Sequence, residues 1–196
     1  MKDQKQCGAG WAFAAVGAIE SKLAIEGSHT QTLSEQQLLD CDVNGLNAGC
    51  NGGYASEGMK YFTDRYLFTD SAYKYTGQTG SCLYNVEDSS EVKLQSYKRI
   101  DGRDVNTVKL AVSEQPVTAA IAARNLAFQN YSGGIFDDDS CAEGDSTHEV
   151  LIVGYGKEGD TEYWLIKNSW GPEWGDQGYM KLKILTEDTS KLKSSI

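Results

Sequence analysis

QKQCGAGWAFAAV, residues 4–16, is a short glycine-containing loop that runs directly into an apolar, alanine-rich segment. The apolar segment contains no proline and keeps large side chains at positions such as Trp11 and Ile19. This pattern predicts a largely buried helix over residues 9–26 that ends near Gly27. The first turn of such a helix presents unpaired N–H groups and the positive end of the helix dipole, which suit an anion or an oxyanion.

The composition describes an acidic chain with enough apolar residues for a packed core. Of the 196 residues, 40% are hydrophobic, and 28 acidic against 18 basic side chains give a formal charge of −10. Because lysine and arginine form no dense cluster, we expect neither nucleic acid nor an anionic membrane surface as a partner. No apolar run approaches the roughly 18–20 residues that a membrane span requires, so we expect no membrane insertion.

The cysteines favour disulfide bonds over a metal site. The five cysteines form no C-x-x-C pair and are accompanied by two histidines, so we expect neither a metal nor a cofactor. Their wide spacing suits disulfides in an oxidising compartment, and the odd count leaves at least one unpaired. No apolar signal segment follows Met1, which is typical of a cytosolic chain or of a fragment of a longer precursor.

Helical patterns precede strand patterns along the chain. Ser34 followed by Gln37 predicts a capping box that opens a second, short helix. Further helices are expected over residues 55–66 and 104–114, and strands over residues 92–100, 117–123, 149–155, 163–168 and 178–184. This order predicts an α+β architecture in two lobes.

Residues 154–159 read GYGKEG and match the dinucleotide-binding pattern G-x-G-x-x-G. That pattern binds a pyrophosphate only when a helix follows it, because the helix N-terminus contacts the phosphates. Here residues 160–166 read as a turn and a strand. We therefore interpret the motif as part of a β-hairpin and reject nucleotide binding.

Several segments together resemble the papain-like cysteine peptidases. Residues 7–11, CGAGW, match that family's signature C-G-[SA]-C-[WY] except at Gly10, where the family has its nucleophilic cysteine. Other family landmarks follow in the family's order: LSEQQLLDC at 33–41, GCNGGY at 49–54, GGIF at 133–136 and WLIKNSWG at 164–171. His148 and Asn168 follow at the downstream spacing expected of the family. The resemblance extends over nearly the whole chain.

The resemblance implies a papain-like two-lobe fold with the active-site cleft between the lobes. Residues 1–103 would form the helical left lobe with the central helix, and residues 104–196 a β-barrel-like right lobe. It also implies the disulfides Cys7–Cys50 and Cys41–Cys82. Cys141 matches a family cysteine whose partner lies near the C-terminus, where this chain has none, so a free thiol is expected there.

The resemblance assigns catalytic roles residue by residue. His148 would be the general base and later the acid, and Asn168 would orient its ring. Gln4 would supply an oxyanion donor together with the backbone N–H of Gly10. The aromatic residues that would shelter the His–Asn contact are Trp170 and Trp174.

The resemblance also implies a peptide-binding surface. Gly52 and Gly53 would pair with an extended substrate by strand addition. The main specificity pocket would be surrounded by Tyr54, Ala120, Thr147 and Glu149. Since Glu149 stands where a small residue is usual, a partly acidic pocket that favours a basic side chain is expected.

A glycine at the nucleophile position leaves three hypotheses open. The chain is a natural pseudopeptidase that binds peptide, a cysteine endopeptidase whose nucleophile was mutated to Gly10, or a structural protein with a vestigial cleft. Expected partners are a peptide or protein segment, a propeptide or a cystatin-like inhibitor. The resemblance implies a secretory route to the lysosome, vacuole or extracellular space, and the Asn130-Tyr131-Ser132 sequon is consistent with it.

Overall fold

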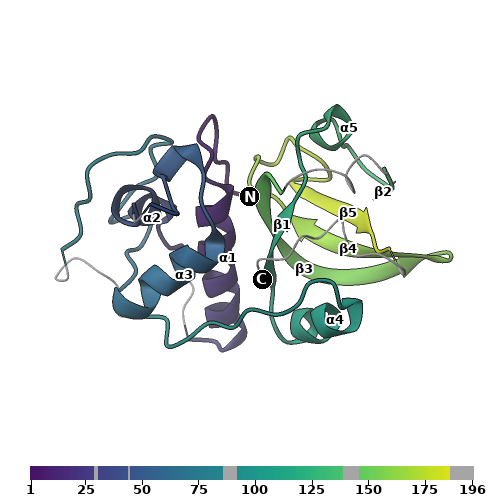
Figure 1. Ribbon diagram of the computed structural model, residues 1–196, viewed down its shortest axis with the longest axis horizontal. Coiled ribbons are helices and arrows are strands. Elements are labelled where there is room, and N and C mark those ends of the chain that lie inside the picture. Colours follow the sequence, from purple (N-terminus) through teal and green to yellow (C-terminus); the bar gives the residue numbers. More distant parts are fainter. Residues whose placement is uncertain (29–30, 44, 86–91, 139–145, 186–196) are drawn as a thin grey trace. The chain divides into compact units, whose positions relative to one another are not determined.

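The computed structural model describes residues 1–28, 31–43, 45–85, 92–138 and 146–185. The chain divides into two compact units. Residues 4–98 form one, here called the helical unit, and residues 1–3 with 99–196 form the other, here called the sheet unit. Figure 1 labels the helices and strands of both, and each unit is described by itself.

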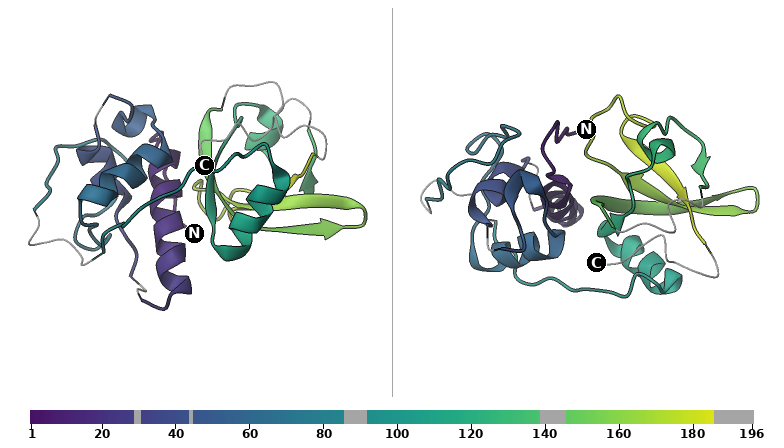
Figure 2. Two further views of the ribbon diagram at one scale, coloured as in Figure 1. Left: turned by 60° about the horizontal axis from the view of Figure 1, so that its bottom comes forward. Right: turned by 45° about the horizontal axis from the view of Figure 1, so that its top comes forward.

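The helical unit is built around α1, Gly10–Ile25. Residues 10–19 of this helix are all buried, which explains why the sequence is apolar around its whole circumference. α1 packs against α2, Glu35–Cys41, and α3, Ala55–Asp64, and these helices lie side by side in the views of Figure 2. A single turn of 3-10 helix, η1, spans Gly49–Asn51. The predicted central helix is therefore present within one residue at each end.

The N-terminus of α2 confirms half of the predicted capping box. The Ser34 Oγ accepts a hydrogen bond from the Gln37 backbone N–H at 3.1 Å. The Gln37 side chain does not return to Ser34, because its Nε2 donates to the Tyr66 carbonyl at 2.9 Å and its Oε1 accepts from the Phe68 N–H at 2.8 Å. Gln37 thus ties α2 to the segment that follows α3.

The expected strand over residues 92–100 is wrong. Lys93 forms one isolated bridge with Tyr66, and residues 94–100 belong to no strand. The flanking backbone bonds, from Leu67 N–H to the Val92 carbonyl at 2.9 Å and from Leu94 N–H to the Phe62 carbonyl at 3.1 Å, fix only the start of the segment. Alternating apolar and polar residues form a strand only where the edge of another strand is available for pairing. Here the chain leaves the helical unit, and residues 94–100 pair with no strand in the described part of the chain.

The sheet unit contains one five-stranded sheet with the order β1-β3-β4-β5-β2. Its strands are β1 Val117–Ile121, β2 Ile135–Phe136, β3 His148–Glu158, β4 Thr161–Lys167 and β5 Tyr179–Lys183. All neighbours are antiparallel except β2 and β5, which are parallel. The sequence did not predict β2.

The helices of the sheet unit are short and capped by side chains. α4, Val105–Glu114, begins after Asp104, whose carboxylate accepts from the N–H groups of Asn106 and Thr107. α5, Leu126–Gln129, begins after Asn125, whose side chain accepts from the Phe128 N–H. The sequence did not predict α5, since a single helical turn carries no periodicity.

The motif GYGKEG lies in the long hairpin of β3 and β4, which is visible in Figure 2. Glu158 pairs with Thr161 across the turn, and Gly159 adopts a positive φ of 59°. A strand rather than a helix follows the motif, so the hairpin interpretation is confirmed.

Each unit has its own hydrophobic core. Trp11, Leu38 and Phe62 are fully buried in the helical unit, and Trp164 and Ile166 in the sheet unit. Among the described residues, no helix is long and apolar enough to cross a membrane. The same residues contain no cluster of three or more histidine, cysteine, aspartate or glutamate side chains that could hold a metal ion.

Candidate functional site

Gly10 is the first residue of α1 and is buried. The preceding residue, Ala9, occupies the N-cap position and offers no side chain to the first helical turn. The first N–H groups of a helix have no acceptor inside the helix, and the dipole places partial positive charge there. The start of α1 therefore has the local chemistry expected of an oxyanion site, with no side chain at residue 10.

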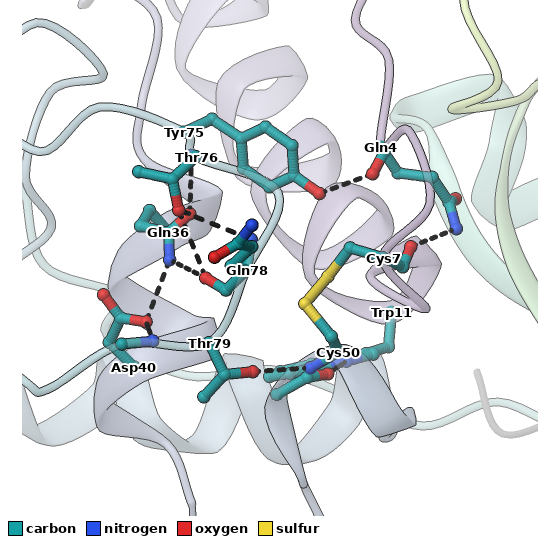
Figure 3. Close-up of a disulfide and its surroundings, with 12 residues drawn as sticks. Gln4, Cys7, Trp11, Gln36, Asp40, Cys50, Tyr75, Thr76, Gln78 and Thr79 are labelled. Carbon is teal, nitrogen blue, oxygen red and sulfur yellow. Dashed lines mark hydrogen bonds between the residues drawn. A yellow bond between two sulfur atoms is a disulfide. The ribbon is translucent and has the colours of Figure 1, made fainter.

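Gln4 is held firmly in the loop before α1. Its Nε2 donates to the Cys7 carbonyl at 2.8 Å, and its own carbonyl accepts a hydrogen bond from the Tyr75 hydroxyl at 2.8 Å (Figure 3). The Gln4 side chain is buried. Tyr75 thus positions Gln4, a role that sequence reasoning missed because the two residues are 71 positions apart.

A disulfide joins Cys7 of this loop to Cys50 of η1, and a second joins Cys41 to Cys82. The structure thus contains both pairs that the resemblance implies, while Cys141 lies outside the described residues. The Gly8 N–H donates to the Cys50 carbonyl at 2.9 Å, and the Trp11 indole donates to the Gly49 carbonyl at 3.2 Å. Together with the Cys7–Cys50 disulfide drawn in Figure 3, these contacts fix the loop before α1 against η1.

Gln36 organises the segment that carries Tyr75. Its Nε2 donates to Asp40 Oδ1 at 2.9 Å and to the Gln78 carbonyl at 2.7 Å, and its Oε1 accepts from the Thr76 N–H at 2.9 Å. The nearby Thr79 hydroxyl accepts from the Cys50 N–H at 2.8 Å. Figure 3 shows these bonds linking α2, residues 75–79 and η1. No motif signals this network, because its members are far apart in sequence.

Gly52 and Gly53 form the backbone segment expected to contact an extended peptide. Gly52 has a φ of 108°, which side-chain-bearing residues rarely adopt. A Cβ on Gly53 would clash with Asn47 Oδ1 and would lie 2.9 Å from Trp11 Cδ2. No hydrogen-bond partner for the Gly53 N–H or carbonyl lies in the described part of the chain. Tyr54, which follows, is 49% exposed.

His148 and Asn168 meet in the sheet unit. The His148 Nε2 lies 2.7 Å from Asn168 Oδ1, and that oxygen also accepts from the Ser169 N–H at 2.8 Å. Because Asn168 Oδ1 can only accept, Nε2 carries the proton in the neutral ring and Nδ1 remains as the acceptor. His148 begins β3 and Asn168 directly follows β4, so neighbouring strands bring the two residues together.

Aromatic rings cover this pair. The Trp170 ring lies 5.0 Å from the His148 ring, centroid to centroid, and 5.3 Å from the Trp174 ring. The Trp174 indole donates to the Gln129 carbonyl at 3.1 Å. Asn168 is 4% exposed, and its Nδ2 has no hydrogen-bond partner among the residues described. The contact is therefore shielded from water, as the resemblance implies.

The candidate pocket residues of the sheet unit gather at the start of β3. Ala120 of β1 pairs with Glu149 of β3, and both are buried. The Thr147 N–H donates to the Ile121 carbonyl at 2.9 Å, and its hydroxyl accepts from the Ala123 N–H at 3.1 Å. Opposite residues of an antiparallel pair project from the same face of a sheet. Ala120 and Glu149 are therefore neighbours there, and Tyr54 belongs to the other unit.

Burial lowers the pKa of His148 from its ordinary value of 6.5 to about 4, against the opposing effect of its hydrogen bond with Asn168. Because the folded-state pKa lies below the unfolded one, the unfolded chain binds more protons between these values. His148 is then neutral at pH 7, and its contribution to stability is lost as the pH falls from 6.5 through 4. The pKa difference corresponds to roughly 3 kcal/mol at most.

We therefore expect the native chain to lose up to about 3 kcal/mol more unfolding free energy between pH 7 and pH 4 than a His148→Gln variant. Urea unfolding at each pH measures this difference. NMR titration of the ring, with a His29→Gln variant to assign the two histidines, reports the pKa directly. A His148 pKa near 6.5, with parallel pH profiles for both proteins, would contradict the prediction.

Known proteins are similar to this chain over nearly its whole length. The model of the family described as papain family cysteine protease matches residues 1–196. A cathepsin L-like proteinase of Phaedon cochleariae is 38% identical over 182 residues, which are 93% of this chain and 56% of the relative. The chain spans about half the length of the curated relatives that it matches.

Solved structures share the fold. Digestive procathepsin L 3 of Tenebrio molitor has a TM-score of 0.89 at 37% identity, covering 97% of this chain and 64% of its own. A Carica candamarcensis cysteine protease in complex with E-64 has a TM-score of 0.86 at 31% identity, covering 98% of this chain and 89% of its own. The chain has the papain-like α+β fold and belongs to the papain family of cysteine proteases.

Proposed function

We propose that this chain binds peptides as papain-family proteases do but scarcely cleaves them, because Gly10 stands where the family has its nucleophilic cysteine. The observation that carries the proposal is an intact, shielded His148–Asn168 pair, with a 2.7 Å contact, in a chain whose residue 10 has no side chain. In this proposal His148 is the base and Asn168 orients it, while residue 10 lacks the atom that would attack the peptide.

The missing thiol prevents formation of an acyl-enzyme. Loss of a triad nucleophile typically lowers turnover by about 10⁶, and roughly 10³–10⁴ over water remains from the oxyanion hole and binding. A factor of 10⁶ corresponds to about 8 kcal/mol in the barrier. The neutral His148 would offer Nδ1 as a base to a water molecule, but a general base contributes only about 10²–10⁴. Water cannot therefore replace the thiolate.

Peptide binding would use backbone hydrogen bonds in the helical unit. The Gly53 N–H and carbonyl have no partner in the described residues and can pair with an extended chain. Gln4 Nε2 donates to the Cys7 carbonyl, which holds this amide in the loop before α1. We propose that the Gln4 side chain and the Gly10 N–H contact the carbonyl of the peptide bond that the family cleaves. In this proposal His148 is the base for the same peptide bond.

Glu149 would set the side-chain preference. Glu149 is buried beside the small Ala120, and its carboxylate would favour a positive charge on a side chain bound next to it. We propose that peptides with lysine or arginine at the main specificity position bind more tightly than their leucine counterparts. A Glu149→Gln variant would lose that preference, whereas Glu162→Gln, which changes a carboxylate of β4 outside the proposed pocket, would retain it.

The same surface would accept protein partners. The Tenebrio molitor structure is of a procathepsin, and the Carica candamarcensis structure contains E-64. We propose a propeptide or a cystatin-like inhibitor as a natural partner of this chain. The two disulfides favour an oxidising compartment on the secretory route, such as the lysosome, vacuole or extracellular space.

Fluorescence anisotropy with a labelled peptide tests the proposal, and mass spectrometry of the same mixture measures cleavage. The control ligand is the same peptide with one central backbone nitrogen methylated, which removes the N–H that strand addition requires. We expect saturable binding of the first peptide, weaker binding of the second, and no cleavage above about 10⁻⁶ of the rate of a cysteine-containing relative.

Two outcomes would reject the proposal. Absence of binding to either peptide would favour the vestigial-cleft hypothesis. Rapid cleavage by the native chain would contradict its proposed inactivity, and cleavage that survives in a His148→Ala variant would mean that other residues carry the chemistry. The hypothesis of an endopeptidase mutated at residue 10 is separated from natural divergence by restoring the cysteine.

A further inference from the structure

The segment Asn130-Tyr131-Ser132 directly follows α5, and it is the one Asn-x-Ser/Thr sequence in the chain. Its outer residues, Asn130 and Ser132, are exposed, while Tyr131 is buried. The Tyr131 hydroxyl donates to the Gly134 carbonyl at 2.6 Å, and its backbone carbonyl accepts from the Gly175 N–H at 3.2 Å. Tyr131 therefore anchors the segment and leaves the residues on either side of it at the surface.

The surroundings of Asn130 can accommodate a large substituent. Its Nδ2 donates to the Leu126 carbonyl at 2.8 Å, and the Leu126 side chain is 73% exposed. An amide nitrogen carries two hydrogens, so one remains for a second bond. A sugar attached there would leave the Leu126 hydrogen bond intact and would lie beside an exposed apolar side chain.

We propose that Asn130 is an N-glycosylation site, and this rests on the secretory route proposed above. Asn-x-Ser/Thr is the acceptor sequence of this modification and implies a surface loop. Asn130 Nδ2 forms a bond to the anomeric carbon of a lipid-diphosphate-linked oligosaccharide. The bond from that carbon to the diphosphate oxygen breaks, the lipid diphosphate leaves with the electron pair, and Nδ2 releases one proton.

The position of Asn130 determines which part of the sheet unit a glycan would cover. The backbone carbonyl of Gln129, the preceding residue, accepts a hydrogen bond from the Trp174 indole N–H. The Trp174 ring contacts the Trp170 ring, which in turn contacts the His148 ring. A glycan on Asn130 would stand next to the aromatic residues that shelter the His148–Asn168 pair. It would limit the size of a protein partner approaching this side of the sheet unit without occupying the His–Asn contact itself.

Secretion of the whole chain from insect cells behind an added signal sequence tests the site, because the experiment itself supplies the compartment. The chain carries a C-terminal tag with its own Asn-x-Thr sequence as an internal control. Peptide-N-glycosidase converts a glycosylated asparagine to aspartate, and mass spectrometry locates the change. We expect it at Asn130 in the native chain and in Ser132→Thr, and its loss in Asn130→Gln and Ser132→Ala.

The matched control is Asn106→Gln, since Asn106 is exposed but stands outside any such sequence, and it should leave the Asn130 glycan unchanged. A native chain that is secreted with a modified tag and an unmodified Asn130 would overturn the proposal. Peptide binding measured on the deglycosylated protein is independent of this result, so failure of the glycosylation site and failure of the proposed function are distinguishable.

Discussion

Replacing Gly10 with cysteine is expected to raise peptide turnover by about 10⁶, provided that the rest of the site is competent. The new thiol would stand on the first residue of α1, where the helix dipole and unpaired N–H groups stabilise a thiolate. Under the proposed function, His148, which is neutral at pH 7 with Nδ1 as its acceptor, would be the base for this thiol.

The substitution should leave the fold intact. Cysteine has a better helix propensity than glycine, by a few tenths of a kcal/mol. The activity is measured with a fluorogenic peptide, and covalent labelling by E-64, the compound present in the Carica candamarcensis complex, counts the active thiols. Gly10→Ala and Gly10→Ser are the controls, because they add a Cβ or a hydroxyl without a thiol, and both should remain unlabelled.

The outcome separates the three hypotheses. Recovery of activity and labelling would reject the vestigial cleft and would favour a competent site that lost only its nucleophile. A folded Gly10→Cys protein that neither cleaves peptide nor reacts with E-64 would show that other parts of the site have diverged. If this inactive protein still binds the peptide, the pseudopeptidase hypothesis stands. If it neither binds nor cleaves the peptide, the structural hypothesis remains.

Local patterns were sufficient where a single segment decides its own structure. The central helix was predicted because residues 10–19 are apolar on every side, and a helix buried all round needs no other information. The β3–β4 hairpin was predicted from the residues after Gly159, since a turn and a strand exclude the helix that a phosphate site needs. The Ser34 cap was likewise a contact between residues three positions apart.

Contacts between distant segments could not be predicted in the same way. Gln37 was expected to return to Ser34, but the unsatisfied backbone of Tyr66 and Phe68 competes for its amide. The hydroxyl of Tyr75 fixes Gln4, and Gln36 fixes the segment around Tyr75, through bonds that no motif records. The resemblance implied which residues carry the site. It could not reveal which residues hold them, because those partners follow from packing.

Removal of the Cys7–Cys50 disulfide in a Cys7→Ala, Cys50→Ala double variant is expected to cost about 4 kcal/mol of unfolding free energy. In the chain-entropy model this reflects the larger freedom of the unfolded chain when a link across 43 residues is lost. Removing Cys41–Cys82 is expected to cost almost the same, because that link spans 41 residues. Denaturant unfolding of both variants measures the two losses.

Peptide binding should distinguish the two disulfides even though they contribute almost equally to the unfolding free energy. The Cys7 carbonyl accepts a hydrogen bond from the Gln4 side-chain amide, and Cys50 lies two residues before Gly52. Cys41, by contrast, is the last residue of α2. We therefore expect the Cys7/Cys50 variant to bind the labelled peptide more weakly than the Cys41/Cys82 variant, with both measured where they remain folded. Equal affinities would mean that the hydrogen bonds from Gly8 to Cys50 and from Trp11 to Gly49 hold the loop without the covalent link.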